Sequence, residues 1–233
     1  MIPKIIHYCW FGPKEITPVG KKCIASWKKF LPDYEIKFWN EENSPINVPF
    51  VKDALAAKKY AFVADYVRIW ALKNFGGIYM DTDMLVLKNF DELLDSESFV
   101  GYETENKINA AIIGSNINSV FIDKLFEYYN NLKFEEAKIN EISIPINISK
   151  IYNELAEIYR PRVYSVDYFY SLPFDSTING VFNYKKYITK NSLAVHLWNA
   201  SWLDELNDYR KENQKLSHKV KTWLLILKNK FKL

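Results

Sequence analysis

The sequence predicts an α/β fold, with helices packed on the faces of a central sheet. Strand-like and helix-like segments alternate through the first half of the chain, which is the pattern of such a fold. The chain has 233 residues, of which 48% are hydrophobic and 16% aromatic, so a single domain can bury a large core. It has only 7 Gly and contains no low-complexity tract or internal repeat, which indicates an ordered globular protein.

The first expected elements are a strand, a helix and a second strand. The apolar run KIIHYCWF (4–11) predicts a buried strand, which the Gly-Pro pair at 12–13 ends. A helix is expected next, because apolar side chains recur at helical spacing: Ile24, Trp27, Phe30 and Leu31. The Pro32-Asp33 pair ends this helix. The segment EIKFWN (35–40) predicts the second strand.

The rest of the chain continues this alternation. A loop is expected at 43–49, and one long helix at 51–75, because the helical pattern runs without a break to the Gly-Gly pair at 76–77. Strands are expected at 77–81, 98–103, 109–115, 163–166 and 193–198, an amphipathic helix at 119–132, and a helical insertion at 133–160.

Two carboxylates interrupt the apolar segment GIYMDTDMLVL (77–87). Asp81 and Asp83 are two residues apart, so their side chains converge if the backbone stays extended. Like charges in an apolar setting repel each other and lose solvation, and a divalent cation offsets both costs. Oxygen ligands suit Mg²⁺ or Mn²⁺, which would keep open positions for the phosphates of a substrate. The alternative is a strand-end turn, in which the two Asp side chains cap backbone amides or face water.

A second charged pair lies in the expected helix before this segment. AFVADYVRIWAL (61–72) is apolar except for Asp65 and Arg68, which are three residues apart and share a helix face. An ordinary surface ion pair is one interpretation. The apolar neighbours instead indicate a buried pair, which needs a ligand or network to compensate its charges. A sugar fits this need, since its hydroxyl groups accept from a guanidinium and donate to a carboxylate.

Four segments of the chain, in this order, resemble glycosyltransferase family 32, the "DXD sugar-binding" transferases. They are IPKIIHYCWFG, ADYVR, GGIYMDTD and HLWNASW. That family includes yeast mannosyltransferases and bacterial capsular-polysaccharide enzymes, and the chain is also distantly similar to the clostridial glucosylating toxin domains. The resemblance covers roughly residues 1–115 and 194–202. It implies the mixed α/β fold called GT-A and a retaining transfer of a hexose from a nucleotide sugar, with a UDP-hexose favoured and GDP-mannose as the alternative.

The resemblance also implies roles for single residues. Trp10 would stack on the nucleotide base, and Asp65 and Arg68 would hold the donor sugar and act in catalysis. Asp81 and Asp83 would bind Mn²⁺ or Mg²⁺, with Asp81 also near the nucleotide and Asp83 the more direct ligand. The remaining expected contacts are Asn109 with the donor sugar, His196 with the metal, and Ser201 and Trp202 with the nucleotide diphosphate. No carboxylate is identified as a nucleophile, so a front-face reaction is the hypothesis.

The expected domain organisation is a GT-A-like domain at 1–210, with a possible acceptor-side insertion at 133–187, and a basic amphipathic helix at 211–233. The last segment has seven Lys and one Glu, about +6, so the formal net charge of +3 leaves about −3 for the rest of the chain (3 − 6). This charge argues against nucleic-acid binding, whereas the basic helix would either dock on the domain or contact an anionic membrane.

Three further features bear on location. The N-terminus lacks the pattern of a signal peptide, no apolar run reaches the length of a membrane span, and the two Cys have no metal or redox spacing, so a cytoplasmic protein is expected. The predicted partners are a nucleotide-sugar donor and a saccharide or lipid-linked saccharide acceptor. The alternative functions are a phosphohydrolase of the haloacid dehalogenase type, whose nucleophile also lies in a D-x-D, and a non-catalytic carbohydrate-binding protein.

Overall fold

The structure is a computed structural model, and it describes residues 1–136, 139–177 and 183–199. Its centre is a six-stranded mixed sheet in the order β2-β1-β3-β6-β5-β7. The strands are β1 (Ile5–Cys9), β2 (Glu35–Trp39), β3 (Gly77–Met80), β5 (Ser98–Thr104), β6 (Lys107–Ser115) and β7 (Arg162–Tyr164). β1 is parallel to β2 and β3, β6 is antiparallel to β3 and β5, and β7 is parallel to β5. A small second sheet pairs β4 (Met84–Val86) antiparallel to β8 (Ala194–His196).

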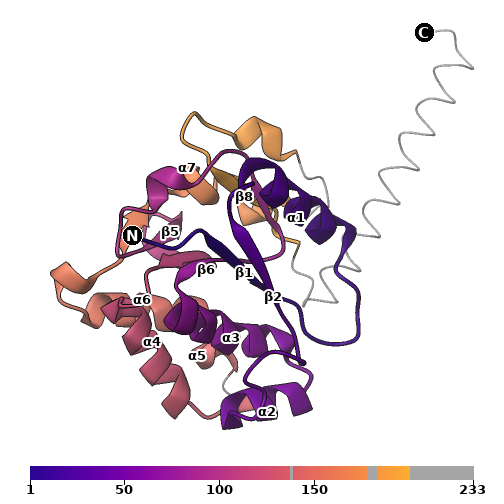
Figure 1. The fold of residues 1–233 in the computed structure, drawn as a ribbon, viewed down its shortest axis with the longest axis vertical. Helices are drawn as coiled ribbons and strands as arrows, with labels where there is room; N and C mark the ends of the chain where they lie inside the picture. Colours follow the sequence, from indigo (N-terminus) through magenta and orange to yellow (C-terminus); the bar gives the residue numbers. More distant parts are fainter. Residues whose placement is uncertain (137–138, 178–182, 200–233) are drawn as a thin grey trace, which may run out of the picture.

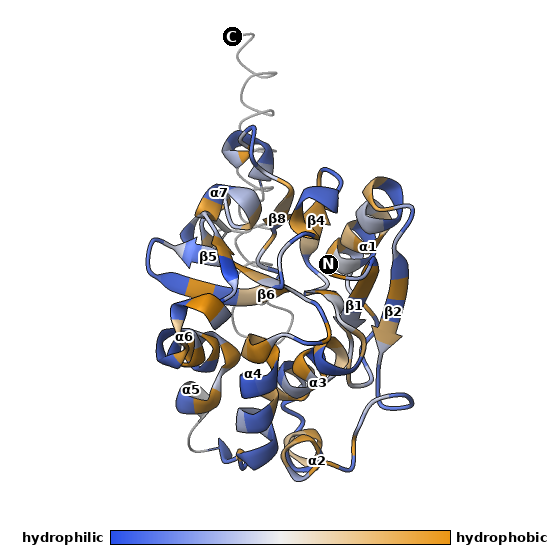
Figure 2. Ribbon diagram, turned by 60° about the vertical axis from the view of Figure 1, so that its left-hand side comes forward, coloured by the Kyte–Doolittle hydropathy of each residue, from blue (hydrophilic) through white to orange (hydrophobic). Residues whose placement is uncertain are grey.

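Helices cover both faces of the central sheet, as predicted (Figure 1). One face carries α2 (Pro49–Ala56), α3 (Tyr60–Phe75), α4 (Val120–Asn131), α5 (Ile139–Ile142) and α6 (Ile144–Glu154). The other face carries α1 (Pro18–Phe30), α7 (Val166–Phe169) and the β4–β8 sheet. Each face has its own apolar core, and helices such as α4 and α6 carry both hydrophobic and hydrophilic residues (Figure 2). Four short 3₁₀ segments complete the described elements: η1 (Asp91–Leu93), η3 (Glu157–Tyr159), η4 (Phe174–Thr177) and η5 (Tyr184–Tyr187).

The single long helix expected at 51–75 is wrong, because the structure has two helices there. α2 ends where Lys58 adopts the left-handed conformation, with a φ of 56°. The Lys59 N–H then donates to the Ala54 carbonyl at 2.9 Å, which satisfies a carbonyl group at the helix end. A Gly usually marks this kind of helix end, and a Lys at this position gives no such signal.

The turn from α3 into β3 depends on the Gly-Gly pair. Gly76 and Gly77 have φ values of 62° and 98°, and a Cβ atom at Gly77 would lie 2.6 Å from the Ile5 carbonyl oxygen. Glycine therefore lets β3 start directly beside β1. His7 holds the same turn, because its ring Nε2 lies 2.7 Å from the Gly76 carbonyl oxygen.

The segment expected as an acceptor-side insertion contributes to the main fold. β7 extends the central sheet, and α6 packs against α4 and β6. Within the aromatic stretch at 166–174, Phe169 and Tyr170 are fully buried in the core, whereas Tyr168 and Phe174 are partly buried. Among the described helices, none has the length and apolar character that a bilayer span requires.

Candidate active site

The two acids of the D-x-D lie in a turn between two sheets, not within one extended strand. β3 ends at Met80 in the central sheet, and β4 begins at Met84 in the small sheet. The Met84 N–H donates to the Asp81 carbonyl at 3.0 Å and closes the turn. The expected extended backbone is therefore wrong, although the two side chains do converge. This turn is also at the carboxyl end of β3, where α/β sheets commonly bind ligands.

Asp83 is bound to the end of β8 and to the segment that follows it. One carboxylate oxygen lies 3.1 Å from Nε2 of His196, and the other accepts the backbone N–H of Asn199 at 2.8 Å. The pairing of β4 with β8 places Met84 opposite His196 and so creates this contact. Ligand atoms of Asp81, Asp83 and His196 all lie within 4.8 Å of one another. The predicted metal ligands are therefore neighbours.

Two observations fit a divalent cation at this cluster. The donor atoms are two carboxylates and one imidazole, a set that Mn²⁺ and Mg²⁺ tolerate and that leaves positions open for phosphate oxygens. In addition, Nδ1 of His196 is buried without a hydrogen-bond partner among the described residues. A buried polar atom without a partner is unusual and indicates a missing ligand.

Arg68 links the charged Asp65–Arg68 pair of α3 to the D-x-D. Its guanidinium lies 2.9 Å from the Asp65 carboxylate and 3.3 Å from that of Asp81, and it donates to the Ala110 carbonyl on β6 at 2.8 Å. It also lies over the ring of Tyr79, with the guanidinium carbon 4.4 Å from the ring centroid. The interpretation of an ordinary surface pair is wrong, because the exposed fractions of the Arg68 and Asp65 side chains are 7% and 9%.

The exposure of these carboxylates decides which of them a substrate meets first. The Asp81 side chain is 31% exposed, far more than its partners on α3. Tyr79 was missed by sequence reasoning, although it lies on β3 only two residues before Asp81; its hydroxyl donates to that carboxylate at 2.9 Å. Arg68 and Tyr79 therefore orient Asp81 at the site.

The pKa values of the cluster follow from burial and charge. Burial raises the pKa of Asp65 to about 6, although the Arg68 charge opposes the rise. Burial alone would raise the pKa of Asp83 and lower that of His196, but the attraction between the two outweighs it in each case. The pKa of Asp83 consequently lies below its usual value and that of His196 above it. The local field therefore favours cationic charge beside Asp83.

Asn109 lies at the same edge of the sheet. It precedes Ala110 and Ala111, whose carbonyl groups accept from Arg68 and from the Asp81 N–H. Its own amide contacts Glu103 at 2.9 Å and Tyr170 at 3.3 Å. Glu103 had no signal in the sequence, because it belongs to no recognisable motif, and the only signal for Tyr170 was its place in the aromatic stretch at 166–174.

Trp10 follows β1 at the edge where β1 and β3 end side by side. The indole is partly buried, and its N–H donates to the Lys14 carbonyl at 2.5 Å, which holds the ring against the following loop. Ser201 and Trp202, together with the expected helix at 211–233, lie outside the described residues.

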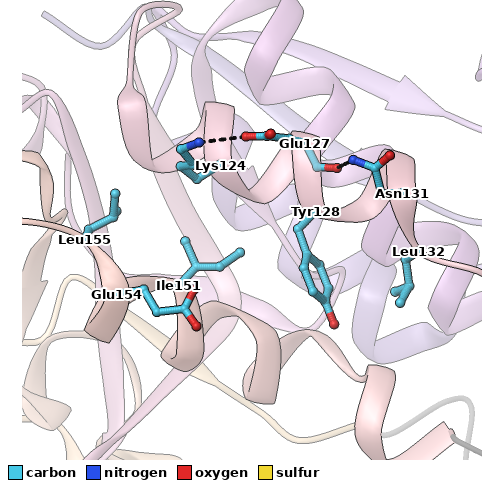
Figure 3. A pocket seen from close by; sticks show the side chains of 8 residues that line it. All are labelled: Lys124, Glu127, Tyr128, Asn131, Leu132, Ile151, Glu154 and Leu155. Carbon is cyan, nitrogen blue, oxygen red and sulfur yellow. Dashed lines mark hydrogen bonds and ion pairs between the residues drawn. The ribbon is translucent and has the colours of Figure 1, made fainter.

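A separate groove lies elsewhere in the helical layer that contains α3 (Figure 3). It runs between α4 and α6, and its lining residues are Lys124, Glu127, Tyr128, Asn131, Leu132, Ile151, Glu154 and Leu155. None of the predicted site residues contributes to it. The groove therefore supplies no support for the predicted chemistry, which rests on the side-chain cluster at the D-x-D.

Comparison with known sequences points to glycosyltransferases. Residues 18–100 match the model of the glycosyltransferase sugar-binding region containing a DXD motif. The chain is 30% identical over 142 residues to a mimivirus protein named uncharacterized glycosyltransferase L373 (Acanthamoeba polyphaga mimivirus), covering 54% of this chain and 55% of that protein. It is 27% identical over 141 residues to the mannosyl phosphorylinositol ceramide synthase CSH1 of Saccharomyces cerevisiae, covering 57% and 36% respectively. The matches thus span about half or less of these relatives' lengths.

Solved structures show the same fold. PaToxG glycosyltransferase superposes with a TM-score of 0.51 at 21% identity, covering 66% of this chain and 69% of that one. The glycosyltransferase GlyE of Streptococcus pneumoniae TIGR4 gives a TM-score of 0.51 at 11% identity, covering 90% and 60%. The mixed sheet with helices on both faces is thus the GT-A type of fold that was predicted. The matched residues 18–100, which contain Asp65, Arg68 and the D-x-D, are thus similar to the DXD-containing sugar-binding region of glycosyltransferases.

Proposed function

We propose that this protein is a metal-dependent, retaining glycosyltransferase that moves a hexose from a nucleotide sugar to a saccharide or lipid-linked saccharide in the synthesis of a surface polysaccharide. The observation that carries the proposal is the convergence of Asp81, Asp83 and His196 beside the buried Asp65–Arg68 pair. A UDP-hexose is the first choice of donor. GDP-mannose is the second, because two yeast relatives are named as mannosyl phosphorylinositol ceramide synthases and one as an inositol phosphoceramide mannosyltransferase.

Asp81, Asp83 and His196 would hold the cation, Mn²⁺ or Mg²⁺. When bound, it supplies positive charge to the diphosphate of the departing nucleotide as the glycosidic bond breaks. The cluster supports this role, because its two carboxylates match the preference of these ions for oxygen ligands, and the buried Nδ1 of His196 has no partner among the described residues.

The other residues of the site would bind and orient the donor. Arg68 holds Asp81 and Asp65 on either side of itself, so a donor sugar meets a pre-arranged set of charges and not a flexible one. Trp10, at the adjacent strand end, offers an aromatic face to the nucleotide base. Ser201 and Trp202 are proposed to close over the diphosphate. The leaving phosphate would take the proton of the acceptor hydroxyl in a front-face reaction.

The cellular setting is part of the same proposal. A cytoplasmic protein with peripheral contact to the inner membrane face would meet a lipid-linked acceptor there, and the seven Lys at 211–233 would favour anionic lipid. Nucleic acid is not a proposed partner, since about −3 of charge remains on the rest of the chain.

Nucleotide release from a panel of UDP- and GDP-sugars tests the function. We expect slow hydrolysis of one donor with Mn²⁺, lost in Asp83→Ala and on removal of the metal. The matched control is Asp53→Ala, which removes an exposed carboxylate on α2 and should leave release unchanged. No release from any donor, together with no Mn²⁺-dependent nucleotide binding, would overturn the proposal. Phosphate release from phosphate monoesters would instead favour the phosphohydrolase, and metal-dependent binding without turnover the carbohydrate-binding protein.

A further inference from the structure

Glu103 lies at an irregularity in the hairpin of β5 and β6. Tyr102 pairs with Ile108 and Thr104 pairs with Lys107, so the register shifts across Glu103. A β-bulge of this kind turns one side chain away from the regular alternation of the strand. The Glu103 side chain is 16% exposed and is also held by Lys107, at 3.0 Å. The bulge therefore directs a largely buried carboxylate inward.

The inward carboxylate meets the amide of Asn109. The Asn109 amide nitrogen donates to Glu103 at 2.9 Å, and its amide oxygen accepts the Ala111 N–H at 2.8 Å and the Tyr170 hydroxyl at 3.3 Å. These partners allow only one orientation of the amide. A backbone N–H can only donate and an ionised carboxylate can only accept, so the oxygen must face Ala111 and the nitrogen must face Glu103.

With this orientation, the partners among the described residues leave the Asn109 amide one N–H for a further hydrogen bond and no lone pair of its oxygen to accept one. The two lone pairs of the amide oxygen are used by Ala111 and Tyr170, and one N–H is used by Glu103. The second N–H has no partner among the residues that the structure describes. Asn109 can thus offer a ligand a donor but no acceptor.

Asn109 also connects two parts of the candidate active site, the Asp65–Arg68 pair and the Asp83–His196 pair. On one side, the next residue, Ala110, accepts from Arg68. On the other side, Tyr170 bonds to Asn109 and its ring meets that of His196 edge-on, with the centroids 5.7 Å apart. A group bound between Arg68 and His196 therefore lies beside the Asn109 amide.

We propose that Glu103 is a positioning residue that holds Asn109 as a hydrogen-bond donor to a hydroxyl oxygen of the transferred sugar. This inference rests on the proposed function, because it assigns a polarity to the donor-sugar contact of the same site. It extends the site to a charged residue outside every motif of the sequence. Glu103 acts through Asn109 and takes no proton in the reaction.

A swap of the two side chains separates this role from a structural one. Asn109→Asp alone places two carboxylates in contact, which should lower both the melting temperature and turnover. In the double variant Asn109→Asp/Glu103→Gln, the amide nitrogen at 103 donates to the carboxylate at 109, so the hydrogen bond is restored with its direction reversed. We expect the melting temperature to recover. The kcat/KM for the donor should stay roughly tenfold or more below wild type, because the N–H toward the sugar is gone.

Single variants supply the controls. Glu103→Gln keeps an acceptor for the Asn109 N–H, so its loss of kcat/KM should be smaller than that of Glu103→Leu. Lys107→Gln removes only the exposed partner of Glu103 and should leave kcat/KM within about twofold of wild type.

The outcomes are distinguishable. A double variant that turns over like wild type would overturn the donor role of Asn109 while leaving the transferase intact. A melting temperature that does not recover would contradict the Glu103–Asn109 contact itself. A wild type without turnover or donor binding would overturn the proposed function and this inference together, and the melting temperatures would still test the contact.

Discussion

Protonation of His7 should loosen the turn that leads to the D-x-D. The imidazole is fully buried, accepts from the indole N–H of Trp39 at 3.1 Å, and lies 2.7 Å from the Gly76 carbonyl oxygen. The acceptor role of Nδ1 requires the neutral ring, whose Nε2–H then donates to Gly76. Burial lowers the pKa of His7 from 6.5 to about 4, so the folded protein excludes a proton that the unfolded chain binds.

The size of this effect follows from the pKa values. The difference between 6.5 and about 4 corresponds to about 3 kcal/mol of unfolding free energy, at about 1.4 kcal/mol for each pH unit. Because the folded pKa is lower than the unfolded one, this stability is fully present above pH 6.5. It is lost as the pH falls from 6.5 toward about 4.

The assay compares wild type with His7→Gln, which does not titrate but keeps an N–H for the Gly76 carbonyl. Urea unfolding followed by tryptophan fluorescence at intervals from pH 7.5 to pH 4 gives the free energy of each. All other titrating groups are common to the two proteins and cancel in the difference. We expect wild type to lose about 3 kcal/mol relative to the variant between pH 7 and pH 4. A difference that stays constant across this range would refute the burial of a neutral His7.

Four further changes test the site and its support. Gly77→Ala should cost about 1–3 kcal/mol or more, because it forces a side chain onto a φ of 98° against the backbone of β1; unfolding at wild-type urea concentrations would contradict this. Arg68→Met should cost about 3–5 kcal/mol by leaving carboxylates uncompensated, and adding Asp65→Asn should recover part of it in the same unfolding assay. Asp83→Asn should abolish Mn²⁺ binding by calorimetry while the far-ultraviolet circular dichroism is unchanged. Trp10→Ala should weaken nucleotide binding about tenfold while Trp10→Phe retains it, and equal losses would argue against stacking.

The sequence was sufficient for features that depend on local patterns. Asp65 and Arg68 share a helix face because residues three apart always do, and their apolar neighbours indicated that the pair is buried. The Gly-Gly pair likewise indicated where α3 ends and β3 begins. These predictions required no knowledge of distant parts of the chain.

Features that depend on distant partners were not predictable in the same way. The D-x-D turn forms because β4 leaves the central sheet to pair with β8. The residues around the D-x-D do not indicate which distant strand will pair with β4. The inward direction of Glu103 depends on a bulge, which changes the alternation of a strand by one residue. The helix break at Lys58 uses a backbone conformation that the residue type does not signal.

The pairing of β4 with β8 has a consequence for how the site is assembled during synthesis. Asp83 and His196 are 113 positions apart, so a growing chain carries both aspartates long before the histidine exists. During synthesis the contact cannot form before the chain has been made as far as His196, because its second partner is absent until then. The matched region at residues 18–100 therefore cannot complete the cluster by itself. Under the proposed function, cation affinity would accordingly show that the chain has been made and folded as far as β8, and a truncated product would carry the motif without the third of its proposed ligands.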